Sequence, residues 1–209
     1  MPYPVTVSVE RSLTNRNRLT TAFRFILAIP HLLLVGGVGL GASRGGGQGG
    51  RLSLGGETGL LGAVAFLLAI ISWFTIVFGA NHIIGIRQFT AFYMRWRVRA
   101  LAYFMLLRDE YPPFGDAPYP ASLDIVDPVR RDQLTVALRI LLVIPHVLVL
   151  LVLGLVWWLT AILAWLLILL TADYPAALYD YGIGVLRWLL RVEAYVLLMV
   201  DEYPPFSLM

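Results

Sequence analysis

The chain has 209 residues, of which 59% are hydrophobic and 14% are charged, and its mean hydropathy is +0.77. Because soluble domains average about 25% charged residues, this composition indicates an integral membrane protein. The absence of cysteine excludes disulfides, thiolate metal sites and cysteine nucleophiles. The net charge is +3, and in a membrane protein basic residues mark the cytoplasmic face of the protein rather than a nucleic-acid-binding surface.

The first predicted element is a short strand. Residues 5–10 read VTVSVE, in which apolar and polar side chains alternate. A period of two predicts a strand with one buried face. Residues 121–125 show the same alternation and predict a second strand.

Two long apolar stretches follow the first strand, at residues 19–40 and 60–79. Each has the length of about 20 residues that a transmembrane helix needs, so we predict a transmembrane hairpin. The Gly-rich run 41–59 separates them. It lacks the lysine of a phosphate-binding loop, and we expect a flexible extracytoplasmic loop whose role the sequence leaves open.

Residues 87–107 have a mixed character. Arg95 and Arg99 lie four residues apart, which places them on one helical face, and the remainder is rich in aromatic and aliphatic residues. This pattern predicts an amphipathic helix in the cytoplasmic membrane interface, with its arginines toward the headgroups. A further transmembrane span is the alternative, although two arginines would make it costly.

The motif DEYPPF closes this segment at residues 109–114. Its two prolines cannot continue a helix. We expect Tyr111 to anchor at headgroup depth, Asp109 and Glu110 to face water or pair with arginines, and Phe114 to dock on the small sheet. The motif is then a helix stop and packing element; a binding motif for a partner protein is the alternative.

The same order of elements returns in the second half. PYP at 2–4 recurs at 118–120, IPH at 29–31 recurs at 144–146, and DEYPPF recurs at 201–206. Such matches predict two homologous units, at residues 1–115 and 117–209. The second unit has predicted spans at 134–153 and 156–172, joined by a tight turn near 154–158, and an interfacial helix at 176–200. Its matched polar residues are Arg139, Arg187, Arg191, Asp201, Glu202 and Tyr203.

Arginines concentrate before, between and after the two predicted hairpins, and their turns contain only Arg44 and Arg51. The positive-inside rule therefore places both termini in the cytoplasm and predicts a multi-pass protein. Both units then share one orientation and are related by an axis along the membrane normal. The predicted fold class is all-α integral membrane, with four transmembrane helices in two tandem hairpins.

This order of strand, IPH in a span, Arg-Trp in an amphipathic helix and terminal DEYPPF resembles an uncharacterised bacterial membrane family, the domain of unknown function 4389. The resemblance covers nearly the whole chain. It implies a bacterial cytoplasmic membrane protein, often with duplicated units, and it implies no activity and no catalytic residue.

His31 and His146 are the candidate cofactor residues. Each follows a proline inside a predicted span and lies seven residues after an arginine, Arg24 or Arg139. Ionisable residues within spans are functional candidates, and two matched histidines are a possible ligand pair for haem iron, with the arginines near the propionates. Alternatively, a neutral histidine satisfies backbone groups that the proline frees, while the arginines snorkel or hold lipid phosphate.

No GxSxG motif, carboxylate pair or metal-ligand spacing is present in the sequence. We therefore expect a non-enzymatic scaffold or accessory protein without a metal or resident cofactor. Its expected partners are anionic inner-leaflet lipids, bound through Arg95, Arg99, Arg187, Arg191, Arg24 and Arg139, or a membrane protein, or a second copy. A haem protein, and more weakly a lipid or small-molecule transporter with its site between the hairpins, are the alternatives.

Overall fold

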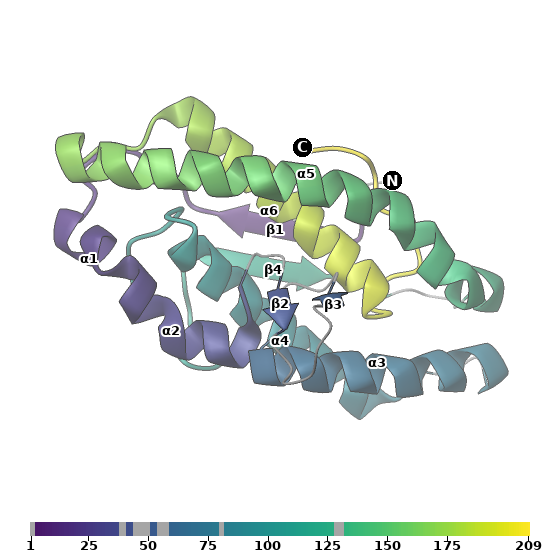
Figure 1. Cartoon of the computed structure of the whole chain (residues 1–209). Helices are drawn as coiled ribbons and strands as arrows, with labels where there is room; N and C mark the ends of the chain where they lie inside the picture. Colours follow the sequence, from purple (N-terminus) through teal and green to yellow (C-terminus); the bar gives the residue numbers. More distant parts are fainter. Residues whose placement is uncertain (1–2, 38–40, 44–50, 54–58, 80–81, 128–131) are drawn as a thin grey trace.

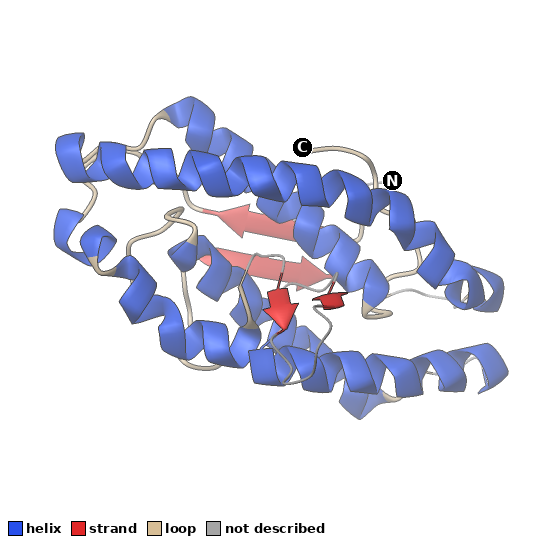
Figure 2. Ribbon diagram, viewed as in Figure 1, coloured by secondary structure: helices blue, strands red, loops and turns tan. Residues whose placement is uncertain are grey.

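The computed structural model describes residues 3–37, 41–43, 51–53, 59–79, 82–127 and 132–209. Within these ranges it is mostly helical, with two small antiparallel sheets (Figures 1 and 2). The helices are α1 (Arg18–Ala22), α2 (Arg24–Val35), α3 (Gly59–Gly79), α4 (Ile84–Phe104), α5 (Gln133–Thr171) and α6 (Ala176–Val196). The strands are β1 (Val5–Val9), β2 (Gly41–Ser43), β3 (Arg51–Ser53) and β4 (Ala121–Ile125). The rest of the predicted Gly-rich loop lies outside the described residues.

Strands β1 and β4 are the two predicted strands, and they pair with each other in antiparallel register. Val7 lies opposite Leu123 at the centre, with Val5 opposite Ile125 and Val9 opposite Ala121. In the repeat, Val5 matches Ala121 and Val9 matches Ile125. Val5 therefore pairs with the counterpart of Val9, and Val9 pairs with the counterpart of Val5. One face of the sheet is buried through its valine, leucine and alanine side chains, and the other exposes serine, threonine and aspartate.

The elements form three layers. The β1–β4 sheet packs against α4 and α6, and α4 and α6 pack in turn against the long outer helices. Helix α4 contacts α2 and α3, whereas α6 contacts α5. In Figure 1, α5 runs along one side and α2 and α3 along the other, with α4, α6 and the fainter, more distant sheet between them.

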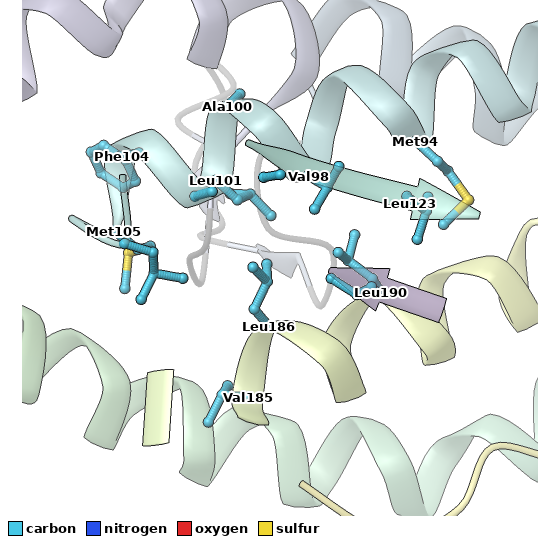
Figure 3. Packing of buried hydrophobic residues seen from close by; sticks show 14 of the residues in the cluster. Met94, Val98, Ala100, Leu101, Phe104, Met105, Leu123, Val185, Leu186 and Leu190 are labelled. Carbon is cyan, nitrogen blue, oxygen red and sulfur yellow. The ribbon is translucent and has the colours of Figure 1, made fainter. Parts of the chain in front are cut away.

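The main hydrophobic core lies in the middle layer (Figure 3). Val98 and Leu101 of α4 face Leu186 and Leu190 of α6, and Leu123 of β4 closes the cluster from the sheet side. All five side chains are almost completely buried. Truncating one of these leucines to alanine leaves a cavity, which typically lowers the free energy of unfolding by about 2–5 kcal/mol.

Helix α5 differs from the sequence prediction. It runs without interruption from Gln133 to Thr171, so the tight turn expected near residues 154–158 is wrong. At 1.5 Å per residue such a helix is about 58 Å long. Gly154 has no positive φ and continues the helix, which Ala172 ends in a left-handed conformation. Most of the α5 surface is apolar, and no periodicity in the sequence distinguished one long helix from two short ones.

Helices α1, α2 and α3 together correspond to α5. Asn17 caps α1 through a hydrogen bond from the Thr20 backbone N–H, and Asp132 caps α5 through one from Leu134. The start of α3 lies against the end of α2, because a Cβ on Gly59 would meet the Leu34 and Gly36 backbones. Figure 1 shows α3 continuing in the same general direction as α2 rather than turning back, which also differs from the predicted first hairpin.

The outer helices meet at both of their ends. Trp73 Nε1 of α3 donates to the Val136 carbonyl oxygen of α5 at 3.0 Å, and Trp165 Nε1 of α5 donates to the Thr21 carbonyl of α1 at 2.9 Å. Trp73 and Trp165 are matched residues of the two halves. The two outer rods are thus fixed to each other at opposite ends, around the middle layer.

Candidate functional site: two arginine–histidine clusters

The first cluster is organised by Arg24, which is completely buried on α2. Its guanidinium donates to the Tyr103 carbonyl at 3.0 Å and to Asp109 Oδ1 at 2.6 Å, and also to the Arg108 carbonyl. Its Cζ lies 4.3 Å from the centroid of the Tyr103 ring, within cation–π range. The aspartate of DEYPPF is therefore the counter-ion of a buried arginine on the outer layer.

His31 lies two turns further along α2 and is enclosed by aromatic rings. Trp96 Nε1 donates to His31 Nδ1 at 3.1 Å. Phe114 stacks on the imidazole at 4.5 Å, and the Tyr111 ring lies at 4.9 Å. The phenylalanine of DEYPPF therefore packs on the histidine, whereas the sequence analysis predicted that it would dock on the small sheet.

The second cluster has the same construction. Arg139 donates to the Tyr195 carbonyl at 2.7 Å and to Asp201 Oδ1 at 3.0 Å, and its Cζ lies 4.2 Å from the Tyr195 ring centroid. Trp188 Nε1 donates to His146 Nδ1 at 3.1 Å, and Phe206 stacks on that imidazole at 4.0 Å. Tyr203 lies 4.8 Å from His146. DEYPPF thus recurs because each copy fastens one outer helix to one middle helix.

The Trp–His hydrogen bonds fix one tautomer of each histidine, because an Nδ1 that accepts a hydrogen bond carries no proton. Each Nε2 is then the protonated nitrogen; it is buried, and it has no hydrogen-bond partner among the described residues. Both rings are held neutral by the geometry. The haem hypothesis needs both Nε2 atoms to face one iron; it stays a prediction, which an absorption spectrum tests.

Asp109 has a second arginine partner in the first cluster. Arg16 forms two hydrogen bonds to its carboxylate, at 2.7 and 2.8 Å. Burial raises the pKa of Asp109, but the hydrogen bonds and charges of Arg16 and Arg24 outweigh this effect and lower the pKa to about 2. The carboxylate is therefore ionised throughout the physiological range and serves as the counter-ion of two arginines.

Glu110 and Glu202 are not equivalent. Glu110 binds Arg108 through two hydrogen bonds of 2.9 and 2.5 Å, and Arg108 also donates to the Glu10 carbonyl. In the second half Val200 takes the place of Arg108, and the Glu202 carboxylate accepts a local hydrogen bond from the Asp201 backbone N–H. The glutamate of the motif therefore makes different contacts in the two halves.

The four arginines predicted to face headgroups also divide into two kinds. Arg95 and Arg99 both bind the carboxylate of Asp116, at 2.9 Å each, and Arg99 is largely buried. Arg187 and Arg191 contact backbone oxygen atoms instead. The sequence indicated the shared helical face correctly but gave no sign of this difference, because Asp116 lies just outside the repeated motif.

Two sets of contacts between helices were not predicted from the sequence. Trp96 and Trp188 were matched in the repeat, but nothing in their spacing indicated the histidine as partner. Arg97 and Glu193 form a buried ion pair with a 2.7 Å contact, and Tyr93 donates to the same carboxylate at 2.9 Å. This pair has no matched counterpart, since the corresponding positions hold Leu189 and Leu101. It joins α4 to α6 across the two halves.

An open hollow of about 730 Å³ lies at the connection between α3 and α4. Phe74, Phe78, His82 and Ile84 line it, and the IPH segments do not. His82 has interactions of its own within the chain. None of the residues that line the hollow belongs to either cluster or to the IPH segments, near which a transporter site was predicted.

Two described helices, α3 and α5, are long and apolar enough to cross a membrane, which weakly suggests membrane association. Their outward side chains are large and exposed; on α5 they include Leu141, Leu148, Leu155 and Ile162, which recur every seven residues. Water-exposed apolar surface of this extent is unusual in a soluble monomer. The fold and its two clusters thus define a helical protein with an apolar outer layer and an internally paired polar core.

The family comparison agrees with this description. A family model described as a domain of unknown function (DUF4389) matches residues 58–115 and 133–207, and the chain belongs to this family. The two matched segments are consistent with a duplicated domain, and each ends in one copy of the DEYPPF motif. Neither a curated protein nor a solved structure matches the chain.

Proposed function

We propose that the protein is a non-enzymatic scaffold that is embedded by its outer layer in the inner leaflet of a bacterial cytoplasmic membrane. In this proposal two copies of one unit each supply an outer rod, α1–α3 or α5, and a middle helix, α4 or α6. Membrane lipids are the first partners, and another membrane protein or a second copy of the chain is the second.

One observation carries the proposal: apolar and polar surfaces lie on opposite layers. Exposed leucines, isoleucines and phenylalanines cover α2, α3 and α5, whereas the exposed sheet face carries Thr6, Ser8, Ser122 and Asp124. Transfer of one exposed leucine side chain from water into hydrocarbon is favourable by roughly 1.5–3 kcal/mol. Lipid therefore covers the outer layer and water covers the sheet.

The length of α5 supports a helix that lies along the membrane instead of crossing it. Its uncharged run from Ile140 to Ala172 is about 50 Å long at 1.5 Å per residue, against a hydrocarbon thickness of about 30 Å. Helix α6 packs on α5, and it carries Arg187, Arg191 and Glu193. A crossing α5 would pull these charges into hydrocarbon, which is costly. We therefore propose an in-plane arrangement in place of the four-span topology predicted from the sequence.

Cysteine labelling tests this arrangement, because the natural chain contains no cysteine. Single substitutions Ser122→Cys, Gln133→Cys, Leu155→Cys and Asp173→Cys report on the sheet and on the start, middle and end of α5. The expected result with a membrane-impermeant maleimide is labelling of residues 122, 133 and 173 from the cytoplasmic side. Residue 155 is expected to react from neither side of intact vesicles.

Other topologies give other patterns. Labelling of residue 155 from the outside means that α5 forms a hairpin and that the in-plane proposal is wrong. Labelling of residues 133 and 173 from opposite sides means a single crossing. Recovery of the protein in the soluble fraction after lysis without detergent refutes the membrane role altogether. Labelling after detergent solubilisation provides the control that each cysteine is reactive.

A further inference from the structure

Helices α4 and α6 each present a pair of arginines spaced by four residues, and the two pairs differ in their counter-ions. Asp116 binds the first pair, and its pKa is lowered by the Arg95 hydrogen bond and by the charges of both arginines. Leu208 stands at the matched position after the second DEYPPF. The second pair therefore lacks the aspartate that neutralises the first.

Among the described residues, the hydrogen bonds of Arg187 and Arg191 use one N–H donor of each guanidinium. Arg187 Nε approaches the Val7 carbonyl at 3.4 Å, and Arg191 Nη1 donates to a backbone oxygen of Met209 at 2.5 Å, while the Tyr3 ring lies 5.9 Å from the Arg191 Cζ. Within the described part of the chain neither arginine has a carboxylate side chain as an ion-pair partner. Each guanidinium carries five N–H donors.

The two guanidinium groups also act on each other. Burial and the charge of Arg187 both lower the pKa of Arg191, and Tyr3 opposes this effect. Like charges at positions i and i+4 of a helix are mutually destabilising. An anion between them removes this repulsion and supplies acceptors for the unused donors. Arginine is the side chain best suited to phosphate, because its planar fork forms two parallel hydrogen bonds.

We infer that Arg187 and Arg191 form a binding site for a phosphate group, and that Arg95 and Arg99 do not, because Asp116 already occupies the equivalent place. The phosphate belongs to an anionic lipid headgroup or to a soluble phosphate. The lipid source rests on the proposed membrane role, and the site itself does not. The inference narrows the six arginines that the sequence predicted to bind lipid to one pair in the second half.

The test measures binding of a fluorescent phosphatidylglycerol to the full chain in neutral detergent micelles. R187Q/R191Q is expected to weaken binding by about tenfold or more, because it removes the charged donors that bind the phosphate. The matched variant R95Q/R99Q is expected to leave the affinity within about twofold. Equal losses in the two double variants, or no loss in R187Q/R191Q, overturn the inference.

A second pair of variants avoids removing any arginine. Leu208→Asp places a carboxylate where the first half has Asp116, so it is expected to reduce phosphatidylglycerol binding, whereas Leu208→Asn changes the polarity without the charge and is expected to retain it. Similar effects of the two substitutions contradict the inference. Thermal unfolding of each variant in detergent shows whether it is folded when binding is measured.

Competition distinguishes the two sources of phosphate. Displacement of phosphatidylglycerol by inorganic phosphate identifies the phosphate group alone as sufficient; displacement only by unlabelled phosphatidylglycerol, with phosphatidylcholine inactive, identifies the anionic headgroup. Both outcomes support the site, and displacement by phosphatidylcholine with equal efficiency refutes it. R187Q/R191Q is expected to keep the cysteine-labelling pattern of the parent chain, so that failure of this site is separable from failure of the membrane proposal.

Discussion

Asp109 holds two buried arginines at once, and its loss therefore has a larger effect than that of an ordinary surface carboxylate. Its side chain is 20% exposed, whereas those of Arg16 and Arg24 are each 1% exposed. Removing one partner of a buried ion pair leaves the remaining charge without compensation, which costs more than the pair itself contributes. In this cluster two charges are left behind.

The substitution Asp109→Asn is therefore expected to lower the free energy of unfolding by about 3 kcal/mol or more. Thermal unfolding in neutral detergent measures the change. Glu110→Gln is the adjacent control, because the Glu110 carboxylate is half exposed and its ion pair with Arg108 is screened by solvent. Equal melting temperatures of the two variants contradict the role assigned to Asp109.

The same contact sets the expected pH dependence. Because the Asp109 pKa is lowered in the folded state from 3.8 to about 2, its contribution to stability is complete above about pH 4 and is lost as the pH falls toward 2. A shift of this size corresponds to about 2 kcal/mol. The Asp109→Asn variant is therefore expected to lose less stability than the parent chain when the pH falls from about 4 to 2.

At the scale of single residues the sequence identified most members of the clusters but not their connections. Matched positions gave Arg24, His31 and their counterparts, and the repeated motif gave Asp109 and Phe114. The pairing of arginine with aspartate was one of two expectations for the acidic residues, while the stacking of phenylalanine on histidine was missed. A repeat shows which residues are kept in both halves; it contains no information on which of them touch.

Helix α5 makes a sharp prediction at the scale of a single element. A methyl group on Gly154 meets no atom within 4 Å, and glycine in a helix interior is less favourable than alanine by about 1 kcal/mol. Gly154→Ala is therefore expected to raise the free energy of unfolding by up to about 1 kcal/mol. Unfolding in neutral detergent, followed by circular dichroism, measures the change.

Gly182 provides the contrasting variant on the partner helix. A Cβ there would lie 2.8 Å from Trp157 Nε1 and 3.3 Å from a Leu107 methyl carbon, so Gly182→Ala overpacks the α5–α6 contact and is expected to cost about 1–3 kcal/mol. A Gly154→Ala protein that is less stable than the parent chain indicates a turn at this position and contradicts the continuous helix.

The elements that were predicted well are those with a strong local pattern. Alternation indicated both strands. The predicted segment 176–200 contains the helix Ala176–Val196, and the predicted segment 87–107 overlaps most of the helix Ile84–Phe104, which begins three residues earlier. The division of 134–172 into two spans was wrong because it rested on length against bilayer thickness alone. When nearly every side chain of a helix is apolar, composition does not distinguish one long helix in the membrane plane from two that cross it.

At the scale of the whole molecule, three kinds of contact join the two halves. The β1–β4 ladder pairs one strand from each half, the tryptophan bonds join the ends of the outer rods, and Arg97 pairs with Glu193 in the middle layer. Each of these contacts involves groups that would be unsatisfied or apolar surface that would be exposed in a separated half. The two units are thus similar in construction and yet not independent.

Dividing the chain in the exposed loop between Asp116 and Ala117 tests this dependence, because it cuts no helix, strand or cluster. Co-expressed fragments 1–116 and 117–209 are expected to purify together in detergent through a tag on either one. Glu193→Ala is expected to weaken the association, because it leaves Arg97 buried without its partner at a cost of about 3 kcal/mol or more. A division within α5, after Leu153, is the control: it interrupts a continuous helix and is expected to give no stable complex. Fragments 1–116 and 117–209 that purify separately, each with an unchanged melting transition, would mean that the β1–β4 ladder and the Arg97–Glu193 pair do not hold the halves together.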